Sequence, residues 1–88
     1  MYNFQIAETK EFQKTIKKLD AKIYIKIKNI VYPQLRKNPF YGTNIKKLKG
    51  NYENVYRYRI GNYRLFYTIN NDKVIVIITT ISHRKNAY

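Results

Sequence analysis

Residues 55–67 read Val55-Tyr-Arg-Tyr-Arg-Ile-Gly-Asn-Tyr-Arg-Leu-Phe-Tyr67 and place three arginines among aromatic and aliphatic side chains. Gly61-Asn62 is a typical two-residue turn of a β-hairpin, so we expect residues 55–60 and 63–70 to form paired strands. After a second turn, the β-branched run Lys73–Ile81 predicts the central strand, buried on both faces. The second half of the chain is therefore predicted to be a three-stranded meander.

The arginines in this hairpin share one face of the predicted sheet. Arg57 and Arg59 are two residues apart, so their side chains point the same way. The opposite face carries four large apolar side chains: Tyr56, Tyr58, Leu65 and Tyr67. We expect helices to cover that apolar face and to leave an arginine face, the face carrying Arg57, Arg59 and Arg64, open. Across the turn Arg59 and Arg64 become neighbours, which is unfavourable unless an anion binds between them.

The first half of the chain predicts a strand followed by a helix. Tyr2–Ala7 alternates between apolar and polar residues, which is typical of a strand. Thr9 is a suitable N-cap, and Phe12, Ile16 and Leu19 then recur at the spacing of one helical face. This segment is therefore expected to be a short amphipathic helix.

A second helix is predicted from about Ala21 to Leu35, with Asp20 as its N-cap. Residues 23–28 also alternate like a strand, and Pro33 is expected to kink the helix or to start a new turn. We favour the helix because the apolar stripe continues to Leu35. The predicted fold class is α+β in the order β-α-α-β-β-β, an antiparallel sheet with two N-terminal helices packed on one face, in a single domain spanning residues 1–88.

Charge is the strongest feature of the composition. The 88 residues include 18 Lys and Arg against five Asp and Glu, a net charge of +13. A small domain this basic is typical of a partner of nucleic acid or of another polyanion. For the lysines there is an alternative explanation, because the codons of an AT-rich genome favour lysine whether or not the protein binds a polyanion. The apolar run Val74–Ile78 is far shorter than the roughly 18 residues that span a bilayer, and no signal peptide is visible, so we expect a cytoplasmic protein that does not enter a membrane.

The sequence offers few groups for catalysis. There is no cysteine and a single histidine, so no zinc site is predicted, and no glycine-rich phosphate loop is present. Glu53 is the one acidic residue near the arginines. His83 is the best general base, and Tyr88 is placed to stack on a nucleobase or to act as an acid. We expect neither a metal nor a cofactor.

The second half of the chain resembles the RelE/ParE toxin superfamily. The segments that carry the resemblance are Leu48-Lys-Gly50, Tyr56-Arg-Tyr-Arg59, Tyr63-Arg-Leu-Phe-Tyr67, the run from Val74 to Ile81, His83-Arg84 and Tyr88. They cover residues 46–88, whereas the first half matches only in its β-α-α order and in Asn38-Pro39 before Gly42.

The resemblance implies a toxin of a type II toxin–antitoxin system. RelE-like members cleave mRNA in the ribosomal A site, by attack of a 2′-hydroxyl and without metal. The implied catalytic positions are Arg57, Arg59, Arg64, His83, Arg84 and Tyr88, and the implied RNA-binding positions are Lys46, Lys47 and Lys49. Arginine is a poor base because it keeps its proton, so His83 is preferred as the base, followed by Lys46 or Lys49.

The implied partners are mRNA in the ribosomal A site and a cognate acidic antitoxin. The antitoxin would fold on the basic surface of a monomeric toxin within a hetero-oligomer, covering the arginine face or displacing the C-terminal tail. Two alternatives stay open at this point. One is a ParE-like toxin that inhibits DNA gyrase, and the other is a small RNA-binding module without catalysis.

Overall fold

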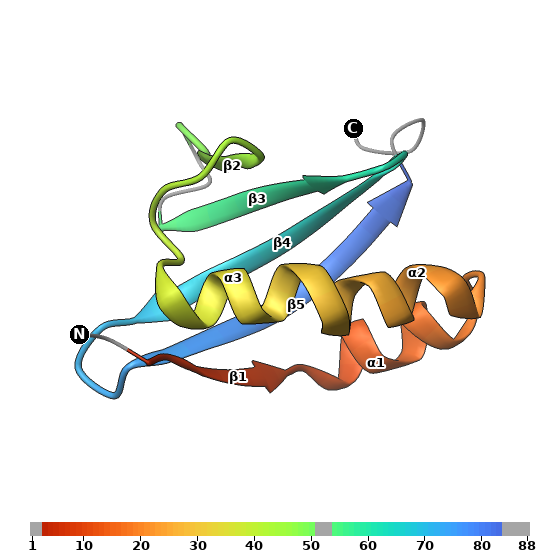
Figure 1. Cartoon of the computed structure of the whole chain (residues 1–88), viewed down its shortest axis with the longest axis horizontal. Coiled ribbons are helices and arrows are strands. Elements are labelled where there is room, and N and C mark those ends of the chain that lie inside the picture. Colours follow the sequence, from red (N-terminus) through yellow and green to blue (C-terminus); the bar gives the residue numbers. More distant parts are fainter. Residues whose placement is uncertain (1–2, 51–53, 84–88) are drawn as a thin grey trace.

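Five strands form one sheet in the order β1-β5-β4-β3-β2 in the computed structural model of the chain, which describes residues 3–50 and 54–83 (Figure 1). The strands are β1 (Gln5–Glu8), β2 (Ile45–Lys47), β3 (Val55–Ile60), β4 (Tyr63–Asn70) and β5 (Ile75–His83). The predicted meander of β3, β4 and β5 is confirmed. The sheet is mixed rather than antiparallel, because β1 runs parallel to β5. The sequence also did not predict β2, a three-residue edge strand that pairs antiparallel with β3.

The predicted turn at Gly61-Asn62 joins β3 and β4. Gly61 has a φ of +57°, a left-handed conformation that costs glycine little and that fits the first position of a two-residue hairpin turn. Ile60 pairs with Tyr63 on either side of it, and the same register runs back to the pair of Val55 with Thr68. The turn therefore determines which side chains of the two strands meet.

The expectation that the last strand is central and buried on both faces is wrong. The middle strand is β4, and β5 lies between β4 and β1. Val76, Ile78 and Ile81 of β5 are buried, whereas Ile75 and Ile77 on the other face are only half-buried. The described helices cover one face of the sheet and not the other. The β-branched composition of residues 73–81 therefore predicted more burial than β5 has.

The first helix is α1 (Lys10–Lys17), capped as predicted by Thr9. The backbone N–H of Phe12 donates to the Thr9 hydroxyl at 3.1 Å. Phe12 and Ile16 are buried, so the predicted apolar stripe faces the core.

The second predicted helix is a continuous helical run made of three segments, α2 (Ala21–Lys26), the π-helical η1 (Ile27–Val31) and α3 (Tyr32–Lys37). Pro33 lies in the first turn of α3, directly after the π-helical segment, so its missing N–H falls where the helical hydrogen-bond pattern changes. The N–H of Tyr32 donates to the carbonyl of Ile27, five residues earlier. The proline therefore starts a new turn rather than ending the helix, and the strand alternative for residues 23–28 is wrong.

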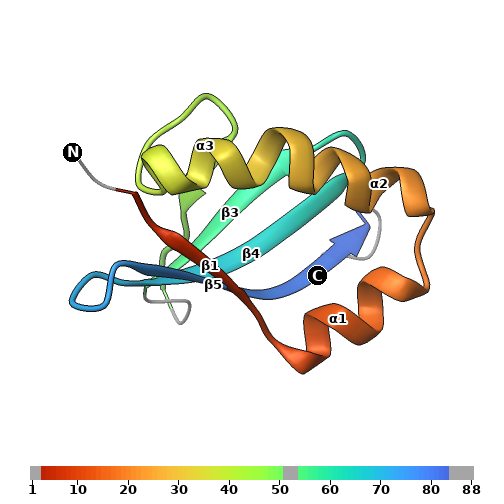
Figure 2. The same cartoon turned by 60° about the horizontal axis from the view of Figure 1, so that its bottom comes forward.

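All the helices lie on one face of the sheet, which we call the helix face (Figure 2). The core between the two layers is built from fully buried side chains of both: Phe12, Ile27, Val31, Leu35, Leu65, Tyr67, Val76 and Ile78. The Tyr67 hydroxyl donates to the carbonyl of Pro39 at 2.8 Å, and burial raises the pKa of this hydroxyl. Within the described residues, no helix is long and apolar enough to cross a membrane.

Candidate functional site

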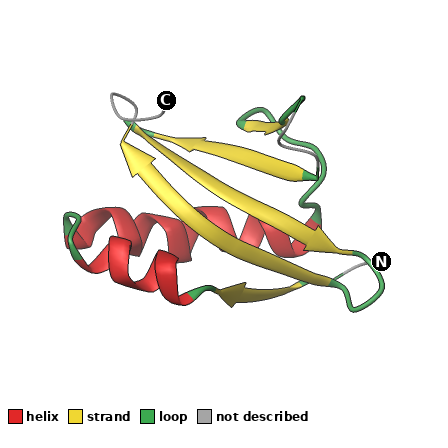
Figure 3. Cartoon of the chain, turned by 180° about the vertical axis from the view of Figure 1, so that it is seen from behind, coloured by secondary structure: helices red, strands yellow, loops and turns green. Residues whose placement is uncertain are grey.

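The arginine face is the side of the sheet that none of the described helices covers (Figure 3). Tyr58, Leu65 and Tyr67 are buried against the helices, as predicted, and Arg57, Arg59 and Arg64 alternate with them along β3 and β4. Arg59 is exposed, and Arg57 and Arg64 are half-buried. The hairpin therefore presents the three guanidinium groups on one surface.

The strand register makes Arg59 and Arg64 direct cross-strand partners. Like charges placed directly opposite each other destabilise a sheet. Of the acidic residues that the structure describes, none lies on β2, β3 or β4 to offset them. The pair is thus a site at which a bound anion would relieve repulsion within the protein.

The next row of this face lies two cross-strand pairs further from the turn. Lys46 of the edge strand pairs with Arg57, and Arg57 pairs with Phe66, whose side chain is only 9% exposed. Paired residues share a face, so the Lys46 ammonium joins the arginine face beside an apolar floor. Planar guanidinium groups can bind the oxygens of a phosphate. The apolar surface beside them can contact the sugar or base attached to that phosphate.

The other two predicted RNA-binding lysines lie elsewhere. Lys47 pairs with Tyr56 and so belongs to the helix face, where its ammonium lies 6.0 Å from the centre of the Tyr56 ring. Lys49 lies in the loop that follows β2. The structure thus brings only Lys46 of the three together with the arginines.

His83 is not brought to the arginine face by the strand register. It pairs with Tyr63, and the two rings meet edge to face with their centres 5.2 Å apart. Tyr63 and its other partner Ile60 belong to the helix face. The strand register therefore does not support His83 as the general base for a phosphate bound at Arg64. The role of His83 as a base stays a prediction. Arg84 and Tyr88 lie outside the described residues.

A β-bulge in β5 is the reason for this placement. Phe66 pairs with Thr80 but the next residue, Tyr67, pairs with Ile78, so Thr79 is an extra residue. The Thr79 hydroxyl donates to the Phe66 carbonyl at 3.0 Å, and the Thr79 carbonyl accepts from the Thr9 hydroxyl at 2.8 Å. Beyond the bulge the alternation of side chains is reversed, because one inserted residue moves every later side chain to the other face.

Ser82, rather than His83, lies on the arginine face. It pairs with Arg64, which places Arg59, Arg64 and Ser82 in one row across three strands. Its hydroxyl is shielded from solvent and has no hydrogen-bond partner among the described residues. Sequence reasoning missed Ser82, and no local pattern could have found it because the bulge decides its direction.

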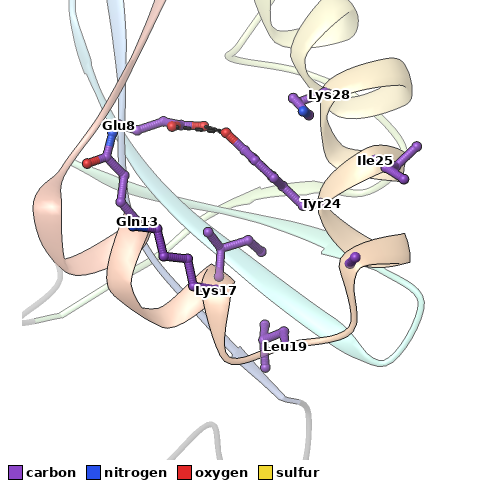
Figure 4. Close-up of a pocket in the computed structure, with 9 residues that line it drawn as sticks. Glu8, Gln13, Lys17, Leu19, Tyr24, Ile25 and Lys28 are labelled. Carbon is purple, nitrogen blue, oxygen red and sulfur yellow. Dashed lines mark hydrogen bonds between the residues drawn. The ribbon is translucent and has the colours of Figure 1, made fainter.

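A separate polar cluster on the helix side joins β1 to the helices. The Tyr24 hydroxyl donates to Glu8 Oε2 at 2.8 Å (Figure 4). The Tyr32 hydroxyl donates to the same oxygen at 2.7 Å. Burial and the hydrogen bond to Glu8 raise the pKa values of both tyrosines. Glu8 and Tyr24 line a cavity of about 600 Å³ between α1 and α2. Because both tyrosine protons are committed to Glu8, we regard this cluster as a structural link between the layers.

Comparison with known proteins places these features in context. A family model described as "ParE toxin of type II toxin-antitoxin system, parDE" matches residues 6–88. Toxin RelE3 of Methanocaldococcus jannaschii is 37% identical over 81 residues, which is 90% of this chain and 89% of that protein.

Two solved structures show the same fold. The toxin chain of a RelB–RelE antitoxin–toxin complex from Methanococcus jannaschii has a TM-score of 0.74 at 35% identity, covering 93% of this chain and 94% of that one. A toxin–antitoxin complex, RelBE2 from Mycobacterium tuberculosis, gives a TM-score of 0.82 at 23% identity, covering 93% of this chain and 99% of that one.

Proposed function

This chain belongs to the RelE/ParE superfamily of type II toxin–antitoxin toxins, and from that premise we propose that it is a ribosome-dependent mRNA endonuclease whose arginine face binds the scissile phosphate. The observation that carries the proposal is the direct opposition of Arg59 and Arg64, with no described acidic residue on β2, β3 or β4. A phosphate between these side chains would convert a repulsive pair into two charge-assisted contacts.

The reaction that this surface suits is an internal transfer at phosphorus. The RNA 2′-oxygen attacks the adjacent phosphorus as a base removes its proton, the bond from phosphorus to the 5′-oxygen breaks, and an acid protonates the leaving 5′-oxygen. The products are a 2′,3′-cyclic phosphate and a 5′-hydroxyl. Arg57, Arg59 and Arg64 would stabilise the charge that builds on the phosphoryl oxygens, each contributing about 10²–10³ in rate by analogy with oxyanion donors.

Lys46 is the proposed base. An amine that has lost its proton can accept another one, whereas a guanidinium group cannot. Lys46 is the one described lysine of strands β2 to β4 that shares the arginine face, and it is in register with Arg57. His83 belongs by register to the other face. Arg84 and Tyr88 keep the proposed roles of phosphate contact and base stacking.

An acidic antitoxin is the proposed protein partner. The related M. jannaschii RelE was solved in complex with the antitoxin RelB. The net charge of +13 favours association with an acidic chain. We propose that such a chain neutralises a monomeric toxin within a hetero-oligomer by covering the arginine face, so that mRNA and antitoxin compete.

Primer extension on an mRNA in translating ribosomes tests the nuclease proposal. The wild-type chain, Arg64→Ala and Arg36→Ala are compared, where Arg36 is an exposed arginine on α3 that serves as the charge-matched control. We expect codon-positioned cuts from the wild type and Arg36→Ala, and at least a 100-fold loss for Arg64→Ala. Cutting by Arg64→Ala at the rate of the wild type would show that Arg64 does not bind the scissile phosphate.

Inhibition of DNA gyrase is the second candidate function, because the matching family model carries the description of a ParE toxin. A supercoiling assay with purified gyrase and the wild-type chain separates the two. Loss of supercoiling without any mRNA cutting would make gyrase the target and would assign the arginines to binding a partner.

A further inference from the structure

An aromatic pocket lies on the other side of the edge strand from Lys46. The loop that follows α3 passes beside β2 and β3 (Figure 1), and Phe40 and Tyr41 of this loop line an open-sided pocket of about 250 Å³ together with Lys47 and Tyr56. This volume is below the usual range for a drug-sized ligand, so the pocket fits one planar ring rather than a whole cofactor.

Part of the aromatic wall of the pocket is anchored in the core. The ring of Tyr56 stacks on the buried ring of Tyr67, with centres 5.6 Å apart and planes 16° apart. Phe40 meets Tyr56 edge to face at 6.1 Å. The Tyr67 hydroxyl holds the carbonyl of Pro39, at the root of the loop. Two of the rings that line the pocket, Phe40 and Tyr56, are thus held in place by contacts with each other and with the core.

Tyr41 stands out among the described residues by its exposure. Its side chain is 79% exposed, the most exposed large apolar side chain among the described residues. The Lys47 ammonium lies 6.0 Å from the centre of the Tyr56 ring. Exposed aromatic rings beside a lysine are the combination with which proteins bind single-stranded nucleic acid, by stacking on the base and contacting its phosphate.

The edge strand connects this pocket to the arginine face. Lys46 and Lys47 are consecutive and point to opposite faces of the sheet, paired with Arg57 and Tyr56 respectively. No strand lies beyond β2 in the described sheet. A strand of RNA crossing this edge can therefore place a phosphate against Lys46 and Arg57 and a nearby base in the pocket.

We propose that Phe40, Tyr41, Lys47 and Tyr56 form a stacking pocket for one unpaired nucleobase of the RNA that the arginine face holds. The identity of the bound strand rests on the proposed function, whereas the preference for a planar base does not. An aromatic side chain of a protein partner would fit the same opening, and comparing oligoadenylate with an abasic strand separates the two occupants.

Binding of a short oligoadenylate with methylated 2′-oxygens tests the pocket, because methylation blocks cleavage. The matched ligand is an abasic strand of equal length, which keeps the phosphates and lacks the bases. Tyr41→Ala is expected to weaken oligoadenylate binding about tenfold and to leave binding of the abasic strand unchanged. Tyr41→Phe should bind like the wild type, and Ile30→Ala, which removes an exposed apolar side chain from the helical run, is the control.

The full chain contains no tryptophan, so Tyr41→Trp provides a direct spectroscopic readout. We expect its fluorescence to be quenched by oligoadenylate and not by the abasic strand. If Tyr41→Ala loses the same affinity for both strands, or loses none for either, the proposal that the pocket binds a nucleobase is wrong. Weaker antitoxin binding by Tyr41→Ala with unchanged affinity for oligoadenylate would overturn it as well.

The failure of the pocket and the failure of the nuclease are distinguishable. If Arg64→Ala abolishes ribosomal cutting while Tyr41→Ala leaves oligoadenylate affinity unchanged, the nuclease stands and the pocket falls. If no cutting is seen but the affinity and the quenching depend on Tyr41 and on the bases, the pocket stands and the nuclease falls.

Discussion

At the scale of single residues, the direction of each side chain decides its chemistry. Ser82 and His83 are neighbours, yet Ser82 pairs with Arg64 on the arginine face and His83 pairs with Tyr63 on the other. Lys46 and Lys47 divide in the same way at the edge of the sheet. The choice of base therefore depends on strand register rather than on residue type.

Replacing Lys46 and His83 separately tests this choice. Lys46→Gln is expected to slow mRNA cleavage at least 100-fold, because general acid–base catalysis typically contributes 10²–10⁴. His83→Gln is expected to change it by less than about threefold. Single-turnover cleavage rates across a range of pH are the measurement. A larger loss, or a flattened pH profile, in His83→Gln alone would return the role of base to the histidine.

The opposed arginines predict a small stability gain when one of them is removed. Arg59→Gln is expected to raise the free energy of unfolding by roughly 0.2–1 kcal/mol at low salt, because Arg64 loses its like-charged partner. The gain should shrink as salt screens the pair. Urea unfolding at low and high salt measures it, with Arg36→Gln as a control expected to gain nothing. A destabilised Arg59→Gln would mean that the pair is not repulsive in the folded protein.

At the scale of elements, the helices and the sheet are joined by a few shared groups. The Thr9 hydroxyl accepts from the N–H of Phe12 at the start of α1 and donates to the carbonyl of Thr79 at the bulge of β5. One side chain thus satisfies backbone groups of two elements that are 70 residues apart in the chain. The bulge and the start of the helix stabilise each other.

Thr9→Ala is therefore expected to lower the free energy of unfolding by more than the loss of an ordinary N-cap does. It loses the capping bond and the bond to β5, together about 1–3 kcal/mol of unfolding free energy. Thr9→Ser keeps the hydroxyl and should stay within roughly 0.5 kcal/mol of the wild type. Urea unfolding followed by circular dichroism is the measurement. If both variants lose the same stability, the methyl group rather than the hydroxyl is responsible.

At the scale of the whole molecule, two layers are held together by buried tyrosines as well as by aliphatic packing. Tyr32 is 4% exposed and its hydroxyl donates to Glu8 of β1, and Tyr67 reaches the carbonyl of Pro39. Burial raises the pKa of both hydroxyls above the ordinary value of 10.0. The unfolded chain therefore releases these protons at a lower pH than the folded protein does.

Alkaline pH is accordingly expected to destabilise the fold. Stability from these tyrosines is fully present below pH 10 and decreases as the pH rises above that value, because only the unfolded chain then ionises. Tyr32→Phe should be about 1–3 kcal/mol less stable at neutral pH, since it loses a hydrogen bond to a carboxylate. Its stability should fall less steeply than that of the wild type above pH 10. Parallel slopes in urea unfolding from neutral to alkaline pH would contradict this account.

The amino-acid sequence by itself determined the types of most elements and the face on which most of their side chains lie. The strand and helix periods, the caps at Thr9 and Asp20 and the turn at Gly61-Asn62 are local properties, and the structure confirms each of them. The gathering of the three arginines on one face and the pairing of Arg59 with Arg64 followed from the same local rules.

Only the tertiary structure decided the features that depend on long-range pairing. These are the parallel pairing of β1 with β5, the edge strand β2, the position of β4 in the middle of the sheet and the bulge at Thr79. The bulge needs Phe66 and Thr9 as partners, and neither is near Thr79 in the chain. A single inserted residue reverses the alternation of all later side chains, so local periodicity alone cannot determine which of Ser82 and His83 faces the arginines.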